Sequence, residues 1–398
     1  MGKKNTRPTQ PTKYTNNGVQ LKRVLILGGG FGGIATARRL KQKLADKVEV
    51  ILVDRRGYFM VGFRKSWALI GESTLEEGQR PLDSLTSLGV RVMRDPVTRI
   101  DSQARAATMG DQRIDADALV VALGAELIPN AVPGFQEHAF NVYDPQGIPG
   151  AAQALNDFQG GKLLIGIFGA PYKCPPAPFE MALLINDKLK AKGVKANIEM
   201  FSPQPMSLPI LGSAGCDMIE SRLADHGITF HPNHKATSIE AGEVVFANKR
   251  MPYDLLLGVP PHKPPAVVRE SELVGESGWV NVNARTMETS FEGVYAIGDV
   301  VQIMLANGKP LPKAGLFAEQ MGETVAERIA SGFLDEEPTA TFTGEGGCYL
   351  EVGGGKAMMV HGNFLAEPEP EVILTEATTE LFNEKRSFET QRLSEWFE

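Results

Sequence analysis

The sequence predicts an α/β fold with two Rossmann-like dinucleotide-binding domains and a small C-terminal α+β region. Three patterns support this: strand–glycines–helix over residues 23–40, a second strand–turn–helix from residue 161, and a glycine-rich hairpin around residue 348. The polar residues 1–20 are expected to form a disordered tail. The expected domains are a discontinuous first unit, a second Rossmann-like unit and a C-terminal unit, at 21–155 with 266–338, at 156–265, and at 339–398.

Composition and charge narrow the class of protein. The 398 residues carry a formal net charge of −7, which disfavours nucleic acid as a partner. Apolar runs stay short of the ~20 residues of a membrane span, and the polar N-terminus does not resemble a secretory signal. The three cysteines, Cys174, Cys216 and Cys348, are too few and too far apart for a disulfide scaffold. A cytoplasmic protein is therefore expected, in which any disulfide serves chemistry.

The first glycine pattern, RVLILGGGFGGIATARRL, has the spacing of a dinucleotide fingerprint. Gly28 is expected to make the tight turn, Gly30 to let a pyrophosphate approach the backbone, and Gly33 to let the helix pack close to the strand. The next strand, VEVILVD, ends in Asp54, about 20 residues on, where an acid can bind a ribose. A glycine-rich turn without a ligand is the weaker alternative.

Two later motifs indicate which dinucleotide binds. DALVVALGA at 117–125 and GVYAIGDVV at 293–301 both read as buried strands that end in small-residue turns. With the fingerprint, they resemble the flavoproteins of the pyridine nucleotide–disulfide oxidoreductase superfamily, which implies FAD with Asp299 on its ribityl chain. The expected cofactor-binding residues are Gly28, Gly30, Phe31, Gly33, Asp54, Arg55, Ala122, Gly124, Gly298, Asp299, Lys313 and Ala314.

The second strand–turn–helix has lost its fingerprint. Its turn reads GAPYKC from Gly169, so that Pro171 stands at the second glycine position and Cys174 at the third. Proline adds a ring and removes an N–H where a pyrophosphate needs bare backbone. The following strand, ANIEMFSP, ends without an acid or base for a ribose. This domain is therefore expected to keep its fold without binding NAD(P)H.

Cys174 is the residue that gives this turn another use. It precedes an expected helix, and a helix N-terminus together with Lys173 would lower the pKa of the thiol. Glu180, six residues on, could exchange protons with the sulfur. A buried structural cysteine is the alternative.

A second thiol, Cys348, lies in GEGGCYLEVGGGKAMMV, which reads as a hairpin of a small C-terminal sheet. If Cys174 and Cys348 both face the flavin, they form a dithiol–disulfide pair that can exchange two electrons with it. Cys216 lies among apolar residues at helical spacing and is expected to pack in the core.

Six motifs in one order narrow the resemblance. YKCPPAPFE, VPPHKPP, GWVNVN, YAIGDV, LPKAGLFAEQMG and GCYLEVG are similar to those of sulfide:quinone oxidoreductases and of the flavoprotein subunit of flavocytochrome c sulfide dehydrogenases. The resemblance implies that Cys174 and Cys348 are the redox pair and that Glu180 is the acid beside them. It also implies that Lys313 lies near the flavin ring and that Tyr349 flanks the quinone.

The chain departs from these families in three ways. FNVYDPQGIPGAAQAL lacks the third reactive cysteine of many quinone reductases, which argues against polysulfur chains held by three thiols. RRGYFMVGFRKSW lacks the cysteine that links FAD covalently in some members, so FAD is expected to be non-covalent. The export signal of the flavocytochrome subunits has no counterpart here.

The expected enzyme is an FAD-dependent sulfide dehydrogenase. Sulfide would attack an oxidised Cys174–Cys348 pair by thiol–disulfide exchange, and two electrons would pass through FAD to a quinone. Lys313 would stabilise negative charge on the reduced ring. Three alternatives stay open: the flavoprotein subunit of a flavocytochrome c-type sulfide dehydrogenase, a type II NADH:quinone oxidoreductase, and a non-enzymatic FAD-binding redox sensor.

The C-terminus raises the question of membrane contact. KRSFETQRLSEWFE combines aromatic and basic residues, and it predicts either a short interfacial helix or a helix packed on the body. A homo-oligomer is also left open. No metal site is expected, because His231 and His234 have no third ligand nearby and read as a solvated loop.

Overall fold

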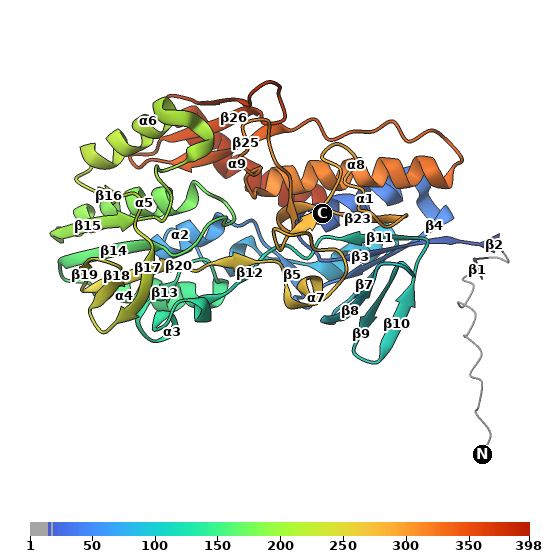
Figure 1. Ribbon diagram of the computed structural model, residues 1–398, viewed down its shortest axis with the longest axis horizontal. Coiled ribbons are helices and arrows are strands. Elements are labelled where there is room, and N and C mark those ends of the chain that lie inside the picture. Colours follow the sequence, from blue (N-terminus) through green and yellow to red (C-terminus); the bar gives the residue numbers. More distant parts are fainter. Residues whose placement is uncertain (1–14, 17–18) are drawn as a thin grey trace, which may run out of the picture.

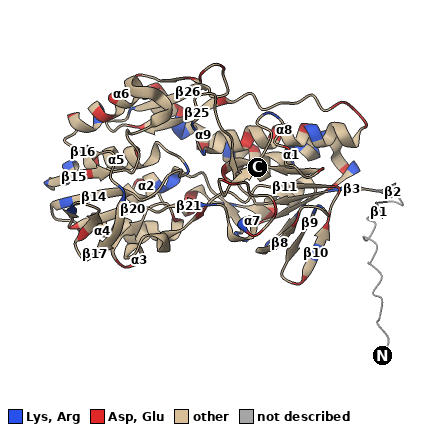
Figure 2. Cartoon of the chain, in the orientation of Figure 1, with Lys and Arg blue, Asp and Glu red and all other residues tan. Residues whose placement is uncertain are grey.

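The computed structural model describes residues 15–16 and 19–398, and it has two parallel five-stranded sheets side by side (Figure 1). Helices α1 and α8 lie together over the first sheet, and the C-terminal strands and α9 lie beside them. This is the α/β fold with two Rossmann-like sheets that the sequence predicts. Charged residues of both signs are spread over both sheets and the helices (Figure 2).

The first sheet has the strand order β23-β11-β3-β4-β7, and every neighbouring pair is parallel. The last four residues of β3 are fully buried, as expected for a strand covered on both faces. β23 follows all strands of the second sheet in the sequence, so the chain returns from the second sheet to complete the first. The elements are β3 (Lys22–Leu27), α1 (Phe31–Leu44), β4 (Val48–Val53), β7 (Val90–Met93), β11 (Ala118–Val121), β23 (Val294–Ala296) and α8 (Gly315–Phe333).

The second sheet has the order β13-β20-β14-β15-β16 and is also parallel throughout. β13 lies before residue 156, where the second unit was expected to begin, so this sheet recruits a strand from the preceding segment. Otherwise the boundaries of the units stay predictions. The elements are β13 (Phe140–Asn141), α4 (Ile148–Asp157), β14 (Gly161–Ile167), α5 (Ala177–Ala191), β15 (Ala196–Phe201), α6 (Gly212–Asp225), β16 (Thr229–His231) and β20 (Leu255–Val259).

The C-terminal region is a three-stranded antiparallel sheet followed by a long helix, as the hairpin pattern predicts. Its elements are β25 (Glu345–Glu351), β26 (Ala357–Asn363), β27 (Glu371–Leu374) and α9 (Thr379–Phe397). The remaining elements are short helices and small ribbons, which are antiparallel except for the parallel pair of β22 and β24: β5 (Tyr58–Phe59), α2 (Arg64–Ile70), β6 (Arg80–Pro81), β8 (Val97–Asp101), β9 (Ala106–Met109), β10 (Gln112–Asp115), β12 (Glu126–Leu127), α3 (Phe135–His138), β17 (Ala236–Glu240), β18 (Glu243–Phe246), β19 (Arg250–Pro252), β21 (His262–Lys263), α7 (Ala266–Arg269), β22 (Val280–Asn281) and β24 (Val301–Gln302).

The expected disordered tail at residues 1–20 lies mostly outside the described residues. Its described part differs from the expectation, because β1 (Thr15–Asn16) and β2 (Val19–Gln20) pair antiparallel through their backbones.

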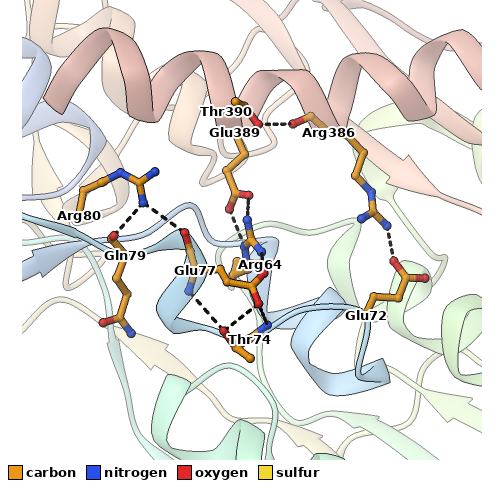
Figure 3. A network of polar contacts seen from close by, with 9 residues as sticks. All are labelled: Arg64, Glu72, Thr74, Glu77, Gln79, Arg80, Arg386, Glu389 and Thr390. Carbon is orange, nitrogen blue, oxygen red and sulfur yellow. Dashed lines mark hydrogen bonds and ion pairs between the residues drawn. The ribbon is translucent and has the colours of Figure 1, made fainter. Parts of the chain in front are cut away.

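Helix α9 is packed on the body. Lys385, Leu393 and Trp396 are buried, and Arg386 and Glu389 form ion pairs with Glu72 and Arg64 (Figure 3). The cations that suggested a lipid contact therefore have protein partners, which favours the packed alternative over an interfacial helix. Over residues 15–16 and 19–398, no helix has both the length and the apolar character that crossing a bilayer requires.

Two of the other sequence expectations concern side chains away from the site. Cys216 is buried on α6 and its thiol lies 3.1 Å from the Leu208 carbonyl oxygen, which confirms the expected core position. His231 contacts the Glu199 carboxylate at 2.9 Å and His234 contacts the Pro232 carbonyl at 2.6 Å, and both side chains are partly exposed to solvent.

The glycines of the first turn lead to a test of the fold. A Cβ on Gly33 would lie 1.8 Å from the Gly28 carbonyl oxygen, whereas a Cβ on Gly30 would meet nothing within 4 Å. Gly33→Ala should therefore destabilise the protein by about 2 kcal/mol or more, and Gly30→Ala, the matched control, should leave the unfolding midpoint of the apoprotein nearly unchanged. Equal midpoints in the two variants would contradict this account of the turn.

Candidate active site

The first glycine turn forms a cradle at the N-terminus of α1. Gly28 has φ of +112°, a backbone conformation that favours glycine because it has no side chain. Its N–H donates to the Val53 carbonyl at 2.7 Å. The space beside Gly30 is open, and no side chain caps the helix that follows. Free N–H groups at a helix N-terminus and bare backbone are what a pyrophosphate needs. The cradle therefore fits the dinucleotide that the fingerprint predicts.

Asp54 closes one side of this cradle. Its buried carboxylate accepts the N–H groups of Gly29 and Arg56, each at 2.7 Å, and lies 3.3 Å from the Arg56 guanidinium. A carboxylate has about four acceptor sites, so hydroxyl donors can still bind. Arg55, which the sequence singled out, and Arg56 are both exposed, and it is the Arg56 guanidinium that contacts the carboxylate, so a role for Arg55 in cofactor binding stays a prediction.

The remaining expected cofactor residues lie on the loops at the ends of neighbouring strands. The Ala122 N–H donates to the Leu27 carbonyl at 2.7 Å, and this hydrogen bond holds the Ala122 loop against the Gly28 turn. Gly124 has φ of +69° with open space beside it. The Phe31 ring packs against Phe59 and Trp396, with centroids 5.0 and 5.6 Å away, so only its backbone belongs to the cradle.

Lys313 is buried beside the turn at Gly298 and Asp299. Its ammonium donates to the Asp299 carbonyl at 2.7 Å and the Val301 carbonyl at 3.0 Å, and it lies 3.5 Å from the centroid of the Trp279 ring. Burial lowers the pKa of Lys313 to about 8, against the opposing charge of Asp299. A small cleft joins these residues to the start of α8, and it is lined by Gly298, Asp299, Leu311, Lys313, Ala314 and Phe317.

The Cys174 turn of the second sheet is fastened to this segment of the first. The Cys174 N–H donates to the Lys313 carbonyl at 2.8 Å, and the Cys174 carbonyl accepts from the Ala177 N–H at 3.0 Å and the Tyr143 hydroxyl at 3.1 Å. Cys174 has φ of +51°, a left-handed conformation that costs a residue other than glycine about 1–3 kcal/mol. Three hydrogen bonds hold the cysteine in this position, next to the expected cofactor residues.

The same turn packs closely against other protein groups. Tyr172 is buried, and its hydroxyl donates to the Pro175 carbonyl at 3.1 Å. A Cβ on Gly169 would lie 2.9 Å from the Pro261 ring. This turn is therefore closely packed by protein atoms, and the expectation that the domain does not bind NAD(P)H stays a prediction.

Cys348 comes from β25 and lies within electrostatic reach of Cys174. Both are half-buried free thiols. Burial, and next the charge of Glu180, raise the pKa of the Cys174 thiol to about 11, although Lys385 and Lys65 oppose this. Burial and the charge of Cys174 raise the pKa of Cys348. The expected lowering of the Cys174 pKa was therefore wrong, because desolvation at this site outweighs the helix N-terminus and the nearby cations.

Glu180 lies buried in the first turn of α5, within electrostatic reach of both thiols. Its Oε2 accepts from the Lys385 ammonium at 2.6 Å and from the Glu351 N–H at 2.9 Å, whereas its Oε1 is buried without a hydrogen-bond partner. Burial raises the pKa of Glu180, and Lys385 opposes this shift. The sequence indicated Glu180 but missed Lys385 and Glu351, which are distant along the chain and ordinary in local pattern.

Tyr349 follows Cys348 on β25 and therefore points to the other face of the strand. Its hydroxyl lies 3.5 Å from a Glu384 carboxylate oxygen on α9, and burial raises its pKa. The side chain thus faces the C-terminal helix, on the opposite side of β25 from the thiol.

Known proteins share this architecture. The solved structure of the sulfide:quinone oxidoreductase from Aquifex aeolicus has the same fold, with a TM-score of 0.84 over 94% of this chain and 91% of that chain at 23% identity. The mitochondrial sulfide:quinone oxidoreductase of Mus musculus is 21% identical over 87% of this chain and 79% of its own length. The sulfide-quinone reductase of Aquifex aeolicus is 25% identical over 78% and 76%.

Relatives with a different named substrate also match. The type II NADH:quinone oxidoreductase of Staphylococcus saprophyticus is 25% identical over 81% of this chain and 85% of its own length. Residues 22–160 and 179–321, well over half of the chain, match the family described as pyridine nucleotide-disulphide oxidoreductase. The chain belongs to the pyridine nucleotide-disulphide oxidoreductase family.

Proposed function

We propose that this chain is an FAD-dependent sulfide dehydrogenase that oxidises sulfide through Cys174 and Cys348 and passes two electrons to a quinone. One observation carries the proposal: Cys174 stands at the position of a fingerprint glycine, and its N–H donates to the carbonyl of Lys313, one of the residues that fit FAD. FAD, held without a covalent bond, supplies two-electron redox chemistry when bound. The residues that would hold it are Gly28, Gly30, Gly33, Asp54, Ala122, Gly124, Gly298, Asp299, Lys313 and Ala314.

The sulfur chemistry begins at the two cysteines. In the oxidised protein they form a disulfide, and HS⁻ attacks one of its sulfurs. A new S–S bond forms as the old one breaks, which leaves one cysteine persulfide and one cysteine thiolate. Lys65 and Lys173 lie within electrostatic reach of Cys174 and favour the approach of an anion.

The raised pKa values define what else the site must do. At neutral pH both cysteines of the reduced pair hold their protons, so each must lose one when the pair is oxidised back to the disulfide. Glu180 is the buried carboxylate beside both thiols, and its unpartnered Oε1 can accept that proton. Glu180 thereby acts as the general base of the sulfur site.

A quinone is proposed as the electron acceptor because the relatives named for sulfide and the relative named for NADH are all named for a quinone as well. Tyr349 is proposed to contact the quinone from the α9 side of β25. An NADH reductase is the weaker candidate, because Pro171 adds a ring and removes an N–H at the second glycine position of the second turn.

Cysteine variants test the proposal. Cys174→Ser should slow the reduction of bound FAD by sulfide about 100-fold or more, and Cys348→Ser should do nearly the same, because the two sulfurs act as one unit. The double variant should be scarcely slower than either single one. Anaerobic stopped-flow absorbance of the flavin measures these rates.

Cys216→Ser is the matched control, since Cys216 is buried on α6, and its rate should stay within a few-fold of the wild type. FAD content should be equal in all variants. Wild-type rates in both single variants would sink the proposal.

The protonation of Cys174 predicts a pH dependence. In a variant with Cys216 and Cys348 replaced by serine, the rate of alkylation of Cys174 by iodoacetamide should rise about tenfold per pH unit from pH 7 to 10, because only the thiolate reacts. The sign follows from a thiol pKa of about 11, which leaves the group protonated below that pH. A rate that levels off below pH 8 would mean a lowered pKa instead.

A further inference from the structure

The C-terminal helix places a fully buried lysine against the sulfur site. The side chain of Lys385 is about 1% exposed, and its ammonium lies 2.6 Å from Oε2 of Glu180 and 3.0 Å from Oε1 of Glu351. It also lies 4.9 Å from the centroid of the Phe63 ring and 5.5 Å from that of Trp67. Two carboxylates and an aromatic wall thus surround the cation, with no water-exposed side.

Stability does not explain this lysine. Burying an ammonium costs several kcal/mol in desolvation, and apolar residues of similar volume often replace a buried ion pair without loss. Helix α9 has other anchors, since Arg392 pairs with Glu319 at 2.9 Å and Arg64 pairs with Glu389. The role of Lys385 is therefore sought in its effect on the two carboxylates that it contacts.

The two carboxylates that share Lys385 differ in their other partners. Glu351 also accepts the Trp67 indole N–H at 2.6 Å, and its second oxygen lies 4.0 Å from Arg386. Glu180 receives both of its donors on Oε2, which leaves Oε1 buried and free. Of the two, Glu180 is thus the carboxylate with a vacant acceptor atom, and its hydrogen bond to Glu351 joins it to β25, the strand that carries Cys348.

We propose that Lys385 is a positioning residue of the sulfur site: its ammonium fixes Oε2 of Glu180 and supplies the opposite charge that allows Glu180 to be an anion beside Cys174 and Cys348. The inference rests on the proposed function, in which a proton leaves a cysteine sulfur for Oε1 of Glu180 and yields a thiolate and a neutral carboxyl group. The C-terminal helix thereby completes a site built mainly by the two sheets.

The sign of the effect follows from the charges. Burial raises the pKa of Glu180 and Lys385 counteracts it, so removing Lys385 raises that pKa further and confines the carboxylate to higher pH. The titratable and charged groups that face Glu180 or its partners are Lys385 and Arg386 of α9, Glu351 and Cys348 of β25, Cys174, Lys65 of α2 and Tyr143.

The experiment is an infrared pH titration of the FAD-loaded protein, which follows the band of a protonated buried carboxyl. The Glu180 signal is identified as the band missing from Glu180→Gln. In Lys385→Met its midpoint should rise by about one pH unit or more relative to the wild type, and the acid limb of the sulfide-dependent flavin reduction rate should move with it. Lys385→Arg should restore most of the shift, since the charge returns.

Arg392→Met is the matched control, because it removes another ion pair of α9 without touching Glu180. Its midpoint should equal that of the wild type. If Lys385→Met does not fold, Lys385→Gln, which keeps a hydrogen-bond donor without the charge, takes its place. An unchanged midpoint in the variant measured, or an equal shift in Arg392→Met, would overturn the inference. Failure of sulfide to reduce the flavin of the wild type would instead overturn the proposed function. The infrared titration would still test the effect of Lys385 on the pKa of Glu180.

Discussion

The hydrogen bond from the Cys174 N–H to the Lys313 carbonyl is the contact on which the site depends. Lys313 belongs to the segment that completes the first sheet, whereas Cys174 ends the first strand–turn of the second sheet. The bond therefore joins the redox candidate to the cofactor cradle and compensates for a strained backbone at φ of +51°. This single bond therefore sets the position of the thiol relative to the residues that fit FAD.

The features that the sequence predicts well are those fixed by short-range rules. Buried parallel strands appear as continuous apolar runs, and the roles of Gly28 and Gly33 follow from the space that a Cβ would need, so the fold class and the cradle could be read directly. The replacement of two fingerprint glycines by Pro171 and Cys174 could also be recognised from the sequence, because each of these positions has a defined geometric role in a dinucleotide turn.

The electrostatics of the site could not be read this way. A helix N-terminus and a neighbouring lysine are visible in the sequence, but the desolvation that raises the pKa of Cys174 depends on what the folded chain places around it. Lys385 lies 205 positions from Glu180, and no local pattern distinguishes a buried lysine from an exposed one on a polar helix. The same limit left two interpretations of α9 open, because the pairing of Lys385 with Glu180 and of Arg386 with Glu72 depends on distant parts of the chain (Arg386 in Figure 3).

The central claim is that electrons enter from sulfur and not from a nicotinamide. Anaerobic titration of the wild-type holoprotein with sulfide and, in parallel, with NADH tests it most directly, with flavin absorbance as the readout. The account predicts rapid and complete bleaching by sulfide and little or slow bleaching by NADH. Rapid bleaching by NADH with none by sulfide would contradict it and would assign the altered turn to nicotinamide binding.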